Sequence, residues 1–200
     1  MRENASNYLS RAFEFSRQFF YKWTVNWRFV PEETFLSKQF TLTLMAIHIT
    51  LLVIFFTTRW MGPSLRPLKS NRAIPITINL FLHPPSQPIQ DTISRDLTPE
   101  WILTTLLTAN AIGMLCARSL HYQFYSWLAW CTPFLLWRAR FHPVLIYLLW
   151  AAQEWAWNVY PSTPISSAVV VSVLALQILG VWNGTRECGS GDIPKKDHVQ

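Results

Sequence analysis

Charged residues are scarce in this 200-residue chain: they make up 14% of it, whereas hydrophobic residues make up 50%. An ordinary soluble domain carries about 25% charged residues. Several stretches with almost no charge approach about 20 residues, which is the length that an α-helix needs to cross a bilayer. The composition therefore predicts a membrane protein and argues against one soluble core formed by the whole chain.

Cysteine and the common catalytic motifs are also scarce. The chain has three cysteines, and Cys116 and Cys131 lie in apolar stretches without C-x-x-C or metal-ligand spacing. The sequence lacks H-E-x-x-H, G-x-S-x-G and a glycine loop that would cradle phosphates. We therefore predict no disulfide framework, no metal site and no cofactor, and we find no support for zinc hydrolysis, serine chemistry or soluble nucleotide binding.

Apolar stretches and tryptophans are what the chain has in abundance. Eleven tryptophans are present, and many flank the apolar stretches, as expected for side chains at the headgroup level. Arg138 and Arg140 separate two shorter stretches, which predicts a helical hairpin. The predicted fold is all-α and polytopic, with about five transmembrane helices near residues 40–58, 101–117, 124–137, 141–156 and 165–182.

The N-terminal segment has an amphipathic pattern. Apolar residues recur at helical spacing opposite a polar face that contains Arg11, Glu14 and Gln18. This pattern predicts an interfacial helix, which acts either as a passive anchor or as one wall of a lipid-substrate site. Periodicity alone favours the anchor. The apolar face consists of Leu9, Ala12, Phe13, Phe19, Phe20, Trp23 and Trp27.

Charge and proline content predict how the chain is oriented. Seven prolines between residues 59 and 100 predict an irregular loop, and basic residues at its start favour the cytosol. The six basic residues of the first 39 positions oppose this orientation. The predicted organisation is a lumenal interfacial segment 1–39, a span 40–58, a cytosolic loop 59–100, a four-helix membrane region 101–182 with lumenal loops 118–123 and 157–164, and a cytosolic tail 183–200.

Polar side chains near the predicted lumenal ends are candidates for chemistry, because polar groups in or beside a bilayer are costly. Guanidinium and imidazole groups hold phosphate oxygens, and aromatic rings stack against sugars. A hydrogen-bonded loop that merely closes the helix ends is an equally good interpretation of the residue types. The candidates are Arg118, His121, Tyr122, Trp157, Asn158 and Tyr160.

Two ionisable residues lie within the predicted spans. Glu154 is the carboxylate there, and it serves either as a proton shuttle or as the partner of Arg118; burial favours a structural ion pair. His48 lies on an otherwise apolar helix, where an interhelical hydrogen bond is the more common role.

Two stretches resemble known families. Tyr8–Val30, with its core K-W-T-V-N-W-R-F, is similar to a motif of endoplasmic-reticulum mannosyltransferases that use dolichyl-phosphate-mannose, including the glycosylphosphatidylinositol mannosyltransferases. R-S-L-H-Y-Q-F-Y at 118–125 and W-N-V-Y-P-S-T at 157–163 resemble the alpha-1,3-mannosyltransferases of asparagine-linked glycosylation. The combination favours the second family.

This resemblance implies a function. It implies the C-terminal portion of a GT-C fold, in the endoplasmic reticulum membrane, that adds an alpha-1,3 mannose from dolichyl-phosphate-mannose to the dolichyl-pyrophosphate-linked five-mannose oligosaccharide. Arg28 and Arg118 would be the phosphate-side cations, and the other candidates would be substrate contacts.

The resemblance also implies that the catalytic carboxylate lies in an N-terminal half that this chain does not contain, so that the chain is truncated or inactive. Membrane lipid is an expected partner and nucleic acid is not. The alternatives are a glycosylphosphatidylinositol mannosyltransferase and a noncatalytic membrane scaffold or transporter fragment.

Overall fold

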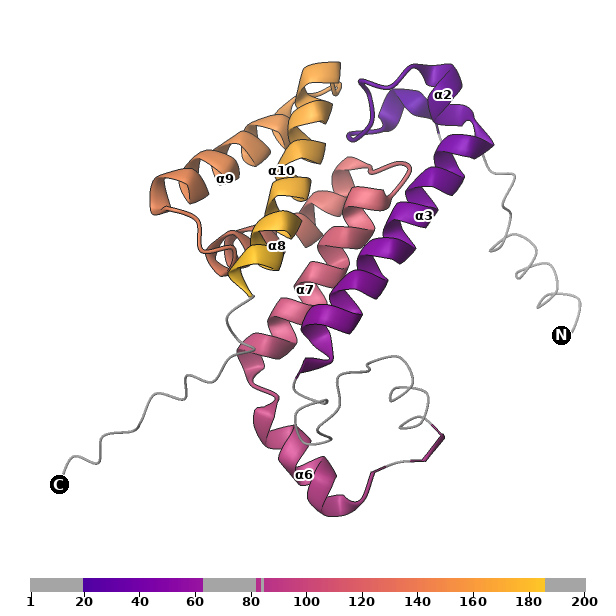
Figure 1. Ribbon diagram of the computed structural model, residues 1–200. Helices are drawn as coiled ribbons and strands as arrows, with labels where there is room; N and C mark the ends of the chain where they lie inside the picture. The colour runs from indigo at the N-terminus through magenta and orange to yellow at the C-terminus, as the bar shows by residue number, and fades with distance from the viewer. Residues whose placement is uncertain (1–19, 63–81, 84, 186–200) are drawn as a thin grey trace, which may run out of the picture.

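The computed structural model describes residues 20–62, 82–83 and 85–185, and its regular elements there are all helices. The predicted all-α class is confirmed. Figure 1 shows two long helices side by side, with three others packed beside them. In chain order the main helices are α3 (Lys38–Phe55), continued by the π-helical η2 (Phe56–Trp60), then α7 (Pro99–Cys116), α8 (Tyr125–Arg138), α9 (Pro143–Asn158) and α10 (Pro164–Gly184).

The starts of these helices follow from local chemistry. The Ser37 hydroxyl accepts the Phe40 amide N–H (3.1 Å) and caps α3, and Thr98 caps α7 in the same way. Thr163 and Ser166 form a reciprocal capping box on α10. Proline occupies the first turn of α7, α9 and α10, where its missing N–H costs nothing.

Two of the described helices are long and apolar enough to cross a membrane, namely Lys38–Trp60 and Pro164–Gly184. The helices α8 and α9 have 14 and 16 residues, fewer than the roughly 20 that a perpendicular span requires. The predicted apolar stretches all form helices, and the count of five spans stays a prediction.

The helix α10 packs against α7, α8 and α9, while α3 packs on α7. Their shared core contains fully buried Ile112, Leu128 and Leu174. It also contains a polar cluster: Gln153 donates to Thr132 (2.7 Å), and Gln177 donates to Gln153 (2.8 Å). Outer faces are apolar as well, which suits lipid or further protein rather than water. Examples are Leu42, Ile49, Leu106, Trp130, Leu148 and Leu179.

Two sequence predictions are corrected here. The amphipathic helix does not run through Trp27: only η1 (Tyr21–Trp23) is helical, and the following residues turn away, with Trp27 at a φ of 57°. Hydrogen bonds to a distant segment, described below, replace those of a helix. Residues 9–19 of the prediction lie outside the described part.

The predicted irregular loop contains a helix, α6 (Gln87–Asp96). Its Pro88 lies in the first turn, where proline starts a helix instead of interrupting one. A short helix, α2 (Glu32–Leu36), precedes α3.

Candidate functional site

Three segments far apart in sequence meet at the end of the bundle where α3 begins and α7 ends. We call them the polar cap, and they comprise residues 21–30, 117–125 and 157–163. They contain every residue assigned to substrate binding from the sequence, whereas Glu154 and His48 lie outside them.

Asn26 joins the first two segments of the polar cap. The Val25 amide donates to the Leu120 carbonyl (2.8 Å), and the Leu120 amide donates to Asn26 Oδ1 (2.8 Å). Asn26 Nδ2 in turn donates to the Ala117 carbonyl (2.7 Å). Because Asn26 is only 1% exposed, these bonds satisfy a buried amide side chain and fix the path of the loop.

Thr24 connects the third segment. Its hydroxyl donates to Asn26 Oδ1 (2.9 Å), and its carbonyl accepts the Ser162 hydroxyl (2.6 Å). Thr24 and Ser162 are both buried. The sequence interpretation missed Thr24 and Asn26 by placing them on a helix, although polar residues inside the aromatic core K-W-T-V-N-W-R-F were the available signal.

The two predicted arginines lie on neighbouring aromatic rings. The Arg28 guanidinium is 4.4 Å from the Tyr21 ring centroid, and Arg118 is 5.4 Å from that of Phe35. The Tyr21 and Phe35 rings are themselves 5.1 Å apart. This arrangement brings both cations to one aromatic cluster.

Both arginines have a side-chain N–H group that no protein atom accepts. Arg28 donates to the Tyr21 carbonyl (3.0 Å) and Arg118 to the Thr41 hydroxyl (3.2 Å), so neither uses a carboxylate in these contacts. The Nε of each is buried with no protein hydrogen-bond partner. A partly buried guanidinium whose buried Nε has no acceptor favours an anionic ligand.

Aromatic side chains form the remaining part of the polar cap. Trp23 stacks on Tyr160 (6.3 Å), and Tyr122 meets Tyr160 edge to face (5.4 Å). Trp23 is 42% and Tyr160 66% exposed, whereas Trp157 is only 4% exposed. Trp23 and Tyr160 therefore present the open ring surface, and the sequence interpretation had assigned no binding role to Trp23.

Tyr122 holds the 157–163 segment in place. Its phenol donates to the Val159 carbonyl (2.6 Å). Burial raises the pKa of the Tyr122 phenol above its ordinary value, so the group stays a donor. The other two candidates lie nearby: His121 is half-buried before η3 (Tyr122–Phe124), and exposed Asn158 donates to the Glu154 carbonyl (2.7 Å).

The ion pair between Arg118 and Glu154, the favoured of the two roles considered for Glu154, is not formed. The Tyr125 phenol donates to Glu154, while Arg118 is directed toward Thr41 at the start of α3. The two side chains have different neighbours because Arg118 follows α7 and Glu154 lies on α9. In the described ranges, the recorded ion pair is Arg138–Glu100, at the opposite end of the bundle. No group of three or more potential metal ligands occurs among the described residues.

Helices with apolar outer faces and a polar, aromatic cap at one end define a helical membrane protein with a candidate site for an anionic ligand. The chain belongs to the ALG3 protein family, whose model matches residues 1–167. The resemblance to alpha-1,3-mannosyltransferases predicted from the sequence is thereby confirmed.

Curated relatives cover most of this chain. A Dol-P-Man:Man(5)GlcNAc(2)-PP-Dol alpha-1,3-mannosyltransferase of Neurospora crassa is 60% identical over 182 residues, 91% of this chain and 41% of the relative. The protein of that name from Homo sapiens is 42% identical over 91% of this chain and 39% of its own length. The chain thus spans about two fifths of the length of these relatives. No solved structure matches it.

Proposed function

We propose that this chain forms the C-terminal part of an enzyme that transfers mannose from dolichyl-phosphate-mannose to the dolichyl-pyrophosphate-linked five-mannose oligosaccharide in alpha-1,3 linkage. The names of the relatives give the donor and the acceptor of those proteins. The observation that carries the proposal is the pair of arginines on adjoining rings, each with a buried, unused Nε donor.

The arginines suit the phosphates of these substrates. Both substrates attach sugar to lipid through phosphate, and the donor phosphate gains negative charge as its bond to mannose breaks. A guanidinium binds phosphate oxygens in a planar, often bidentate geometry. Fixed donors aimed at developing charge lower the barrier of such a transfer. We assign Arg28 and Arg118 to this role.

The aromatic residues suit the sugars. Exposed Trp23 and Tyr160 offer ring faces within the polar cap, and His121 and Asn158 contribute polar groups from the same segments. Because its phenol is already bonded to Val159, we assign Tyr122 to positioning the Tyr160 loop. Buried Trp157 packs edge to face against the Tyr122 ring and so supports the position of that loop.

The general base is proposed to come from outside this chain. The Tyr125 phenol donates a hydrogen bond to Glu154 Oε1, and Glu154 lies on α9, outside the segments of the polar cap. An inverting transfer requires a base that removes the proton of the acceptor hydroxyl. The chain alone, produced in cells that lack the alpha-1,3-mannosyltransferase, should therefore leave the five-mannose lipid-linked oligosaccharide accumulating.

We further propose a multi-pass protein of the endoplasmic reticulum membrane, with the polar cap on the lumenal side. The ends opposite the cap carry Arg59, Arg138 and Arg140, and positive charge beside spans favours the cytosol.

The test substitutes lysine for arginine in the complete gene product that contains this chain. Lysine keeps the charge but loses the planar fork. Loss of one charge-assisted hydrogen bond in the transition state lowers turnover roughly ten- to a hundredfold. We expect this loss for Arg28→Lys and Arg118→Lys in mannose transfer from a dolichyl-phosphate-mannose analogue, normalised to folded protein.

Arg95→Lys on exposed α6 is the matched control and should keep full turnover. Normal turnover of both cap variants, or a loss that only follows lower abundance, would make these arginines structural and overturn the assignment.

A further inference from the structure

A groove without charged residues begins at the polar cap and follows one side of α10. Its volume is about 540 Å³, within the range of roughly 300 to 1,000 Å³ that is typical of ligand sites. We call it the apolar groove. Among the described residues that line it, Phe29 comes from the polar cap, Leu149 from α9 and the others from α10.

One face of α10 gives the apolar groove its length. The residues of this face are three or four positions apart, so they lie one above the other on the helix. Small side chains occupy the middle of the face and larger ones its two ends. From first to last the helix rises about 16 Å, a length that suits a chain better than a compact ligand. The residues of the face are Ile165, Ala168, Ser172 and Leu176.

The start of the apolar groove is joined to the proposed phosphate site. Phe29 follows Arg28 in the chain, and the Arg28 amide N–H donates to the Ser167 hydroxyl of α10 (2.7 Å). Ser167 is fully buried and directly precedes Ala168 of the groove. The same stretch of backbone therefore carries the arginine proposed to bind phosphate and one wall of the groove.

The apolar groove also leads along a helix that is suited to the interior of a membrane. α10 is long and apolar enough to span, and it lies beside α9 in the bundle (Figure 1). Phe29, Ile165 and Leu176 are exposed apolar side chains along this route. A lipid whose phosphate lies at the cap must direct its apolar chain away from water. The groove offers that chain a path from the cap along α10.

We propose that the apolar groove binds the polyprenyl chain of the sugar donor. This proposal rests on the proposed function, from which it takes the donor and the role of Arg28. The donor chain is favoured because Arg28 is assigned to the phosphate that departs from the mannose. Each buried methylene group strengthens binding by about a factor of four, so the groove makes affinity depend on the length of the donor lipid.

The first test fills the apolar groove in the complete gene product that contains this chain. Ala168→Leu and Ser172→Leu add apolar bulk at the middle of the groove. Ala151→Leu is the matched control, because Ala151 is exposed on α9 outside the lining. Mannose transfer is measured with dolichyl-phosphate-mannose and with a short citronellyl-phosphate-mannose, whose lipid ends near the cap.

We expect both groove variants to raise the KM for the long donor about tenfold, which corresponds to about two methylene groups excluded from the groove. The advantage of the long donor over the short one should then disappear. Ala151→Leu should keep it. Lower abundance of both groove variants, with an unchanged KM for the folded fraction, would make these positions structural and overturn the proposal.

Photocrosslinking gives a second readout that does not require transfer. A polyprenyl phosphate with a diazirine in its chain is irradiated with the purified protein, and peptide mass spectrometry locates the label. We expect label within residues 164–176 of the wild type and its loss in Ser172→Leu. Label at that position in a protein that transfers no mannose would contradict the proposed function and support the groove. Reduced turnover of Arg28→Lys, with label elsewhere, would overturn the groove and leave the proposed function intact.

Two other occupants of the apolar groove have their own signatures. If the groove variants raised the KM for the dolichyl-pyrophosphate acceptor and not that for the donor, the groove would belong to the acceptor chain. If phosphatidylcholine at equal concentration displaced the labelled polyprenyl phosphate, the groove would bind bulk lipid. Either result would overturn the assignment to the donor.

Discussion

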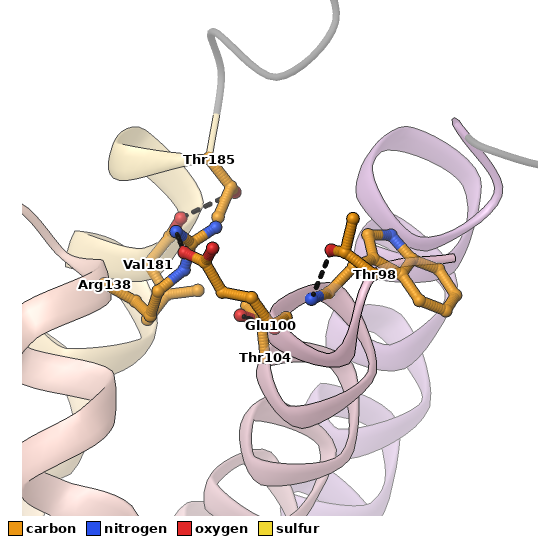
Figure 2. A network of polar contacts seen from close by, with 7 residues as sticks. Thr98, Glu100, Thr104, Arg138, Val181 and Thr185 are labelled. Atoms are coloured by element: carbon orange, nitrogen blue, oxygen red, sulfur yellow. Dashed lines mark hydrogen bonds and ion pairs between the residues drawn. The ribbon is translucent and has the colours of Figure 1, made fainter. Parts of the chain in front are cut away.

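The two ends of the helix bundle place arginine side chains in different surroundings. In the polar cap, Arg28 and Arg118 lie over aromatic rings and make their recorded hydrogen bonds to a carbonyl and a hydroxyl. At the opposite end, Arg138 forms an ion pair with Glu100 (Figure 2). An anion at the cap therefore meets two guanidinium groups that pair with no carboxylate of the described residues, whereas Arg138 already has a carboxylate partner.

The ends also differ in what holds them together. Side-chain and backbone hydrogen bonds between segments about 90 to 140 residues apart fix the cap loop. Helix packing holds the opposite end together, and backbones approach closely there: a Cβ on Gly184 would lie 2.3 Å from the Arg138 carbonyl oxygen. A substitution that removes a cap hydrogen bond should therefore perturb the cap alone, and one that disturbs helix packing should perturb the opposite end alone.

The largest effect is expected for Asn26→Ala. The substitution leaves the buried Leu120 amide without its acceptor and removes the Asn26 bonds to the Ala117 carbonyl and the Thr24 hydroxyl; the Ala117 carbonyl still accepts the Trp27 indole N–H (3.0 Å). The unsatisfied amide costs about 1 to 3 kcal/mol and each of the two lost hydrogen bonds about 0.5 to 1.5 kcal/mol, so we expect about 2 to 6 kcal/mol less stability in denaturant unfolding. Exposed Asn158→Ala is the control and should change little. Normal stability of Asn26→Ala would show that the loop is held by other contacts.

An intermediate effect is expected for Gly184→Ala, at the other end. The added methyl group meets backbone atoms that cannot rotate away, and overpacking of this kind costs about 1 to 3 kcal/mol. Gly113→Ala is the matched control, because no atom lies within 4 Å of its added Cβ. We expect lower thermal stability for Gly184→Ala alone. Equal behaviour of the two variants would contradict the close approach of α10 to the α8–α9 turn.

The smallest effect concerns pH and the cap. The pKa of Tyr122 is raised by burial, so the protonated phenol is the form that the folded state favours. Its contribution is fully present below the unfolded pKa of about 10 and is lost as the pH rises through the folded pKa. Tyr122→Phe should lower stability at neutral pH by about 1 kcal/mol and flatten the decline above pH 10. Unfolding midpoints at several pH values test this, and parallel curves for the two proteins would count against it.

The helices were predictable from the sequence because apolar length is a local property. The predicted stretch 165–182 became Pro164–Gly184, and 124–137 became Tyr125–Arg138. The path of residues 24–30 was not predictable, because it depends on pairing with Leu120, nearly a hundred positions away. The helical pattern of the preceding apolar residues does not show that hydrogen bonds to Leu120 compete with those of a helix.

The candidate site was predicted in part for the same reason. The residues that gather in the polar cap were identified from motifs, but the neighbours of Arg118 and Glu154 depend on which helix faces which. The group of charged residues at the other end of the bundle was not predicted either. Arg59, Glu100 and Arg138 come from three helices, and only their packing brings these charges together.

The polar cluster of Gln153, Thr132 and Gln177 has a consequence for motion. It connects α8, α9 and α10 through three hydrogen bonds between buried side chains. If one helix slid along its axis by a single turn of about 5.4 Å, all of its bonds in the cluster would be lost. The cluster therefore opposes axial sliding of the three helices and keeps the two ends of the bundle at a constant separation.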